Sequence, residues 1–329
     1  MNKPIVVESN LVPNLLQFIL VGLEAGGFHK MAHPAYRDEY SLWISQERRD
    51  FFSDVFSKLE GVSSSTWFAL LYQIPAYLAD DTLDSLLDVI GLLSKQDTRS
   101  VIERYPEKAV LIERYIPKSD FHMYLGFKGK PIGSWPKLLQ VFSDIVEETY
   151  NNLYAERWKI IKPSLVTVSQ QLNSDFLGGF DWVNWWEERT GISFVYPHFQ
   201  VELIDAMTTM GTSLLAERDG FYAHVDPIRI ATMISHEICT HMLFSKDALT
   251  NDVVGPLMRD NLEQYLRTVE VISWATNREF VDELGWKWTM EKSFDWIGPQ
   301  KDKVSALVGN MEVEDYWDIM REGYSLMGK

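Results

Sequence analysis

The residues of this chain whose types and spacing could do chemistry are His236, Glu237 and His241, which form the pattern HExxxH. They lie in residues 226–244, where most other positions are apolar and an Asp-Pro pair predicts a helix start. Such a helix is expected to be buried. Unpaired polar groups in an apolar environment cost free energy, and a bound metal ion would offset that cost. The alternative is a plain helix with two hydrogen-bonded core histidines.

The spacing of the two histidines makes a geometric prediction. The common zinc pattern HExxH places both imidazoles on one helix face and uses the glutamate as general base. Side chains at i and i+4 are about 40° apart around a helix, whereas those at i and i+5 are about 140° apart. A regular helix therefore cannot direct His236 and His241 at one ion. The metal interpretation predicts a single π-type turn between Glu237 and His241.

A third ligand is expected on a second helix, which begins at about residue 260. Helical spacing places four side chains of this segment on one stripe: Glu263, Arg267, Glu270 and Trp274. Glu270 is flanked by apolar residues, so its carboxylate is held in an apolar setting and is the preferred candidate. Three later acids on the same helix are the alternatives: Glu279, Asp282 and Glu283.

Residues 213–280 resemble the HExxxH zinc metallopeptidases. The sequence HEICTH is similar to the HEIGTH of the group that carries a later EGLA-type glutamate and includes tubulin tyrosine carboxypeptidases, and dipeptidyl peptidase III shares the expanded motif. The resemblance implies that His236, His241 and Glu270 bind Zn²⁺ and that Glu237 is the base. Cys239 stands where the group has glycine, Glu270 is followed by Val-Ile-Ser where the group has Gly-Leu-Ala, and the downstream Gly-rich Arg motif is missing.

The activity that this resemblance implies is that of a zinc-dependent hydrolase, a metalloprotease acting on a peptide or protein. Three protein ligands would leave a fourth zinc position for water. Glu237 would take the proton of that water and return it to the leaving amine. The oxyanion that develops needs a further donor, and three residues are candidates for this substrate-binding role: Tyr222, His224 and Arg267.

Two other interpretations remain open. The departures from the family pattern favour a non-catalytic helical binding or regulatory protein with a degenerate or structural metal site. Two histidines and one carboxylate can also hold Fe(II), which would make the protein a redox protein. Metal analysis separates iron from zinc, and a peptide-library assay separates an enzyme from a binding protein.

The net charge of the chain limits its partners. The sequence has 31 basic and 47 acidic residues, which gives a formal charge of −16. Nucleic acids and anionic membrane surfaces are bound through basic faces, so neither is expected as a partner. The same field disfavours a very acidic substrate such as a tubulin tail. The oligomeric state does not follow from composition.

Cysteine content and hydropathy indicate a cytoplasmic location. Cys239 is the only cysteine, so an internal disulfide is excluded, which is consistent with a reducing compartment. We interpret Cys239 as a small buried residue. The apolar run Leu15–Leu23 is interpreted as an amphipathic helix, since no clear cleavage site follows it. No run approaches the ~20 apolar residues of a membrane span.

The expected fold is α+β and predominantly α. Residues 1–130 are predicted to form a helical bundle, and residues 131–329 a gluzincin-like metallopeptidase domain with a small sheet. The boundary is placed in the segment 124–136, which is rich in Gly and Pro. Ile192–Tyr196 and Gly211–Leu215 are predicted as short strands because of their β-branched and aromatic content.

Overall fold

The chain forms two compact units in a computed structural model that describes residues 3–23, 43–57, 69–95, 98–109, 134–206, 212–215, 217–243, 252–287, 300–309 and 316–328. We call them the C-terminal unit (Met1–Val7, Gln170–Val201 and Val225–Lys329) and the N-terminal unit (Glu8–Ser169 and Glu202–His224). The expected boundary after residue 130 lies outside the described residues, and the two units divide the chain at other positions.

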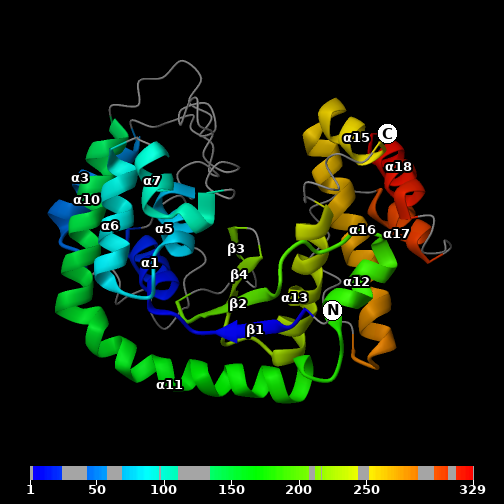
Figure 1. The fold of residues 1–329 in the computed structure, drawn as a ribbon, viewed down its shortest axis with the longest axis horizontal. Helices are drawn as coiled ribbons and strands as arrows, with labels where there is room; N and C mark the ends of the chain where they lie inside the picture. Colours follow the sequence, from blue (N-terminus) through cyan, green and yellow to red (C-terminus); the bar gives the residue numbers. More distant parts are fainter. Residues whose placement is uncertain are drawn as a thin grey trace. The chain divides into compact units, whose positions relative to one another are not determined.

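The described part of the chain is mainly helical with one small sheet, which confirms the expected α+β class with a predominance of helix. The N-terminal unit contains most of the earlier helices (Figure 1): α1 (Leu11–Gly22), α3 (Gln46–Ser57), α5 (Ile74–Leu78), α6 (Leu83–Ser94), α7 (Thr98–Arg104), α10 (Ser134–Thr149) and α11 (Ala155–Gln171), which ends just beyond the unit. Short π segments (Ala69–Gln73 and Tyr150–Tyr154) adjoin α5 and α10. Helix α10 packs against α6, α3 and α1.

Two helices of this unit show how sequence and burial correspond. The Thr82 side chain accepts the Ser85 backbone N–H, which caps α6, and α6 buries one face. Helix α1 was predicted to be amphipathic, and that prediction is wrong, because every residue of it is buried. Its polar residue Asn14 bonds to the backbone of Leu203 and Asp205, so this side chain serves a neighbouring segment and not solvent.

The sheet has four strands in the order β1-β2-β4-β3: β1 (Ile5–Glu8), β2 (Phe199–Ile204), β4 (Arg218–Tyr222) and β3 (Thr212–Leu215). Strands β3 and β4 are antiparallel, with an irregularity between Ser213 and Leu215. The strand predicted at residues 211–215 is confirmed as β3.

The prediction of a strand at Ile192–Tyr196 is wrong, because these residues form neither a strand nor a helix. The physical reason lies in the backbone groups of Phe194. Its N–H donates to the Glu187 carboxylate at 2.7 Å, and its carbonyl accepts from Lys3 Nζ at 2.6 Å. Side chains therefore satisfy the polar groups that a neighbouring strand would otherwise satisfy.

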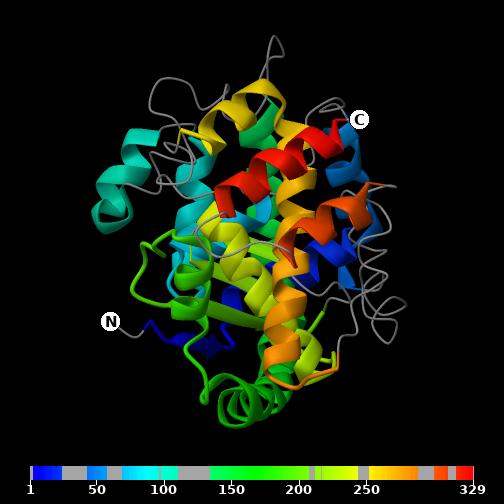
Figure 2. The same ribbon diagram turned by 90° about the vertical axis from the view of Figure 1, so that its right-hand side faces the viewer.

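The C-terminal unit is built from helices around α16 (Leu262–Glu283). Its other helices are α12 (Trp182–Thr190), α13 (Pro227–Leu243), α15 (Val254–Asp260), α17 (Lys301–Val308) and α18 (Tyr316–Met327), and a π segment (Leu172–Leu177) precedes α12. Helix α16 packs against α13, α17 and α18. Figure 2 shows α17 and α18, in orange and red, crossing α16. The unit therefore holds α13 and α16, which carry the candidate residues, side by side.

Candidate functional site

Helix α13 begins where the sequence indicates. The Asp226 side chain accepts the Ile228 N–H at 2.8 Å, and Pro227 occupies the first helical position. The helix is regular through all its 17 residues, so the predicted π-type turn between Glu237 and His241 is wrong. Without the extra residue in that turn, His236 and His241 keep their separation of about 140° around the helix.

His236 lies on the side of α13 that faces α16. It is buried, with 3 % of its side chain exposed, and its Nε2 lies 3.4 Å from Glu270 Oε2. The imidazole stacks on the Trp274 indole, with the ring centres 4.0 Å apart and the planes 14° apart. Glu270 and Trp274 are one helical turn apart on α16. The structure therefore brings together two of the three predicted metal ligands and holds the imidazole by stacking.

Glu270 is a carboxylate held in its charged form. Burial alone would raise the pKa of Glu270, but the contact with His236 and a hydrogen bond from Trp274 outweigh it, so the pKa is lowered from its ordinary value. About 30 % of the Glu270 side chain is exposed, so one side of the pair reaches solvent. A charged acid beside an imidazole is a suitable pair of donors for a divalent cation.

Glu237 and His241 form a second pair on α13. They are four residues apart in a regular helix, so they share a face, and a carboxylate oxygen of Glu237 lies within 4.8 Å of a ring nitrogen of His241. Both are half-buried. The His241 ring contacts Phe199 edge-on at 5.7 Å. His241 is therefore directed at the segment before α13 and not at α16.

The predicted ligand set is thus divided. Across the residues that the structure describes, His236, His241 and Glu270 do not form a group whose ligand atoms all lie within 4.8 Å of one another. The regular helix explains this, because it turns the His241 ring away from the His236–Glu270 pair.

The three alternative acids on α16 have other neighbours or face solvent. Glu279 forms an ion pair with Arg189 at 2.5 Å, and Glu283 accepts the Trp185 indole N–H at 2.8 Å. Asp282 is exposed. Among the four acids of α16 considered as the third ligand, Glu270 is the one that meets a histidine of the motif.

The residues predicted to bind substrate fall in both units. Tyr222 and His224 belong to the N-terminal unit, and Arg267 lies half-buried on α16. His224 Nε2 contacts Asp205 Oδ1 at 2.8 Å, and its ring lies edge-on to Tyr222 at 5.1 Å. Asp205 could not be identified from the sequence, because nothing in its spacing marks it as the partner of His224.

Cys239 is confirmed as a buried residue. Its thiol contacts the Ser273 and Tyr316 hydroxyls at 3.5 and 3.7 Å. Burial raises the pKa of Cys239 to about 12, so the group is a neutral thiol near pH 7. A neutral thiol is a poor metal ligand and a poor nucleophile. Cys239 is therefore part of the packing between α13, α16 and α18.

No family model matches the chain, and no curated protein or solved structure matches it. Within the described ranges, no helix combines the length and the apolar content that crossing a membrane requires. The function must therefore be inferred from the residues on α13 and α16 themselves.

Proposed function

We propose that the protein is a zinc-dependent hydrolase that acts on peptides, with the metal bound at His236 and Glu270. The supporting observation is the 3.4 Å between His236 Nε2 and Glu270 Oε2. A charge-assisted N–H···O bond is shorter, at about 2.7–2.9 Å. Two donors bonded to a tetrahedral zinc ion at about 2.0–2.2 Å lie about 3.4 Å from each other. The spacing of the two atoms thus suits a shared ion better than a direct hydrogen bond.

The surroundings of the pair also support the proposal. Stacking on Trp274 restricts the His236 ring, and the partly exposed Glu270 leaves one side open to solvent. Rigid placement of ligands by neighbouring side chains favours metal binding. Zinc would supply a Lewis acid and a water whose pKa is lowered to about 7. Glu237, the residue after His236, would act as the base.

His241, which the resemblance implies as a third ligand, is left out of the proposed set, because the regular helix directs its ring away from the other two residues. Peptide or protein substrates in the cytoplasm are part of the same proposal. They are consistent with the charge of −16, which disfavours nucleic acid, and with a single cysteine.

Zinc titration of the metal-free protein by calorimetry tests the proposal. We expect one ion per chain, and a loss of affinity of about tenfold or more for His236→Ala and for Glu270→Gln, since second-shell changes alone cost that much. His198→Ala is the matched control, because His198 is a half-buried histidine of the same unit outside the motif. Equal uptake by the wild type and both site variants would overturn the site.

Catalysis needs a separate assay. Glu237→Gln should bind zinc as the wild type does and lose hydrolysis of a peptide library, because the amide cannot accept the proton. His241→Ala should bind zinc as the wild type does, because the His241 ring is directed at Phe199 and away from the pair. Hydrolysis by Glu237→Gln at the wild-type rate would show that another group is the base.

A second candidate is a non-catalytic binding or regulatory protein. The observation that favours it is the regularity of α13, which directs the two histidines of the motif to different neighbours. The His236–Glu270 contact would then be a structural ion pair. In that case the site variants would lower the free energy of unfolding while zinc uptake is absent from the wild type.

A further inference from the structure

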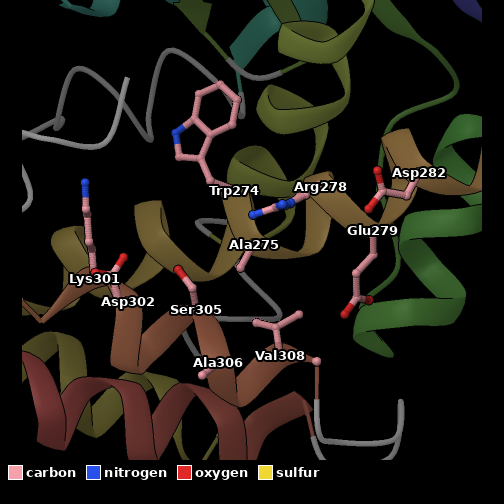
Figure 3. A pocket seen from close by; sticks show the side chains of 11 residues that line it. Trp274, Ala275, Arg278, Glu279, Asp282, Lys301, Asp302, Ser305, Ala306 and Val308 are labelled. Atoms are coloured by element: carbon pink, nitrogen blue, oxygen red, sulfur yellow. The ribbon is translucent and has the colours of Figure 1, made fainter. Parts of the chain in front are cut away.

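A cavity of about 610 Å³ lies in the C-terminal unit between α16 and α17. Figure 3 shows the side chains that line it, from α16 on one side and from α17 on the other. The α16 side includes Trp274, Arg278 and Asp282, which follow one another at intervals of four residues and so form one stripe. The cavity has the size of a small-molecule site, for which about 300–1,000 Å³ is typical.

Trp274 connects this cavity to the candidate metal site. Its indole stacks on His236, donates a hydrogen bond to Glu270 and lines the cavity. Only 5 % of Trp274 is exposed, so it is a fixed wall between the two. A molecule in the cavity would thus be separated from the His236–Glu270 pair by one side chain.

The charges of the cavity are of both signs. Arg278 is exposed, and its guanidinium makes no ion pair or hydrogen bond with any residue that the structure describes. Asp282 on α16 and Asp302 on α17 are exposed carboxylates of the lining. Glu279 also lines the cavity, but it is paired with Arg189. Lys301 on α17 lines the cavity as well and has an interaction of its own. The lining therefore offers the planar guanidinium of Arg278 for a carboxylate and two acids for an ammonium group.

The lining also includes Ser305 and the small apolar residues Ala275, Ala306 and Val308. At Gly309, a Cβ would meet no atom within 4 Å. A wall of this kind accepts backbone and small side chains and leaves room beside Gly309. A tripeptide in extended form spans about 10 Å, which places its two charged ends far enough apart to meet separate groups.

We propose that this cavity binds a short zwitterionic peptide, with its carboxylate at Arg278 and its ammonium group at Asp282 or Asp302. The proposal goes beyond the proposed function: Trp274 separates the cavity from the His236–Glu270 pair, so the peptide is a ligand of a separate site and not the substrate at the pair. Binding itself needs no metal and no turnover, so it can be measured separately.

Calorimetric titration of the metal-free protein with trialanine tests the proposal. N-acetyl-trialanine lacks the ammonium group, and trialanine amide lacks the carboxylate. We expect trialanine to bind and each capped form to bind at least about tenfold more weakly, because each loses a charge-assisted contact. No binding of trialanine up to about 10 mM, or equal affinity for all three peptides, would overturn the proposal.

Two variants locate the binding. Arg278→Gln should weaken trialanine binding about tenfold or more and abolish the preference for trialanine over its amide. Arg259→Gln is the matched control, an exposed arginine at the end of α15 in the same unit. Gly309→Leu should block binding by filling the open space beside the glycine, and Gly91→Leu, at an equally open position in the other unit, should not. An unchanged preference in Arg278→Gln would place the peptide elsewhere.

The two proposals fail in different ways. Peptide binding by the metal-free protein without any zinc uptake would leave the peptide site standing and overturn the zinc hydrolase. If the wild type takes up zinc, His236→Ala does not, and the wild type fails to bind trialanine, the peptide site alone is overturned.

Discussion

Glu270→Gln is the most informative single substitution in the absence of metal. It keeps the size of the side chain and removes the negative charge that lies 3.4 Å from His236 Nε2. Breaking a fully buried ion pair costs about 3–5 kcal/mol. About 30 % of Glu270 is exposed, so solvent offsets part of the loss, and we expect the free energy of unfolding to fall by about 1–2 kcal/mol at pH 7.

The stabilisation by Glu270 should depend on pH, and the direction follows from its lowered pKa. The pKa of Glu270 is lowered in the folded protein, so the carboxylate stabilises the fold above its unfolded pKa of about 4.3. That stabilisation is lost as the pH falls through the folded pKa, which is lower still. The difference between the wild type and Glu270→Gln should therefore be constant from pH 7 to about 5 and shrink below about pH 4.

Urea denaturation of both proteins at pH 7 and at the lowest pH where they stay folded measures the difference. Glu263→Gln is the control, an exposed glutamate on the same stripe of α16, and it should change the free energy of unfolding by no more than about 0.5 kcal/mol. An equal loss for Glu263→Gln and Glu270→Gln, or a loss for Glu270→Gln that is the same at both pH values, would refute the reasoning.

Three further predictions concern the packing within the C-terminal unit. Cys239 should resist a thiol reagent at pH 8 in the native protein and react once urea unfolds it, because burial raises its pKa to about 12. Gly323→Ala should lower stability by about 1–3 kcal/mol in urea denaturation, since a Cβ would lie 3.0–3.3 Å from three methyl groups of α16 and α17, and Gly309→Ala should be tolerated. Trp186→Phe should cost about 1 kcal/mol by the same measurement, because it removes a buried 2.9 Å hydrogen bond to a serine.

The local signals in the sequence predicted where α13 and α16 begin, whereas the π-type turn expected within α13 is absent. Asp226 and Pro227 begin α13 as expected, and Glu270 lies on α16 beside His236. These features depend on caps and on the 3.6-residue period, which are properties of a short segment. The choice of Glu270 among the acids of α16 also followed from its apolar neighbours in the sequence.

The sequence did not predict features that depend on distant segments. The strand expected at Ile192–Tyr196 is absent because Glu187 and Lys3 satisfy the backbone of Phe194. Lys3 is far from Phe194 along the chain, and no local pattern shows that it will be there.

What the sequence by itself determined is the order of donors along α13 and the phase at which a regular helix presents them. Only the tertiary structure decided that His236 meets Glu270 and Trp274 while His241 meets Phe199. The physical reason is that helical phase fixes the angle between two side chains, whereas the packing of other elements against the helix fixes what each side chain contacts.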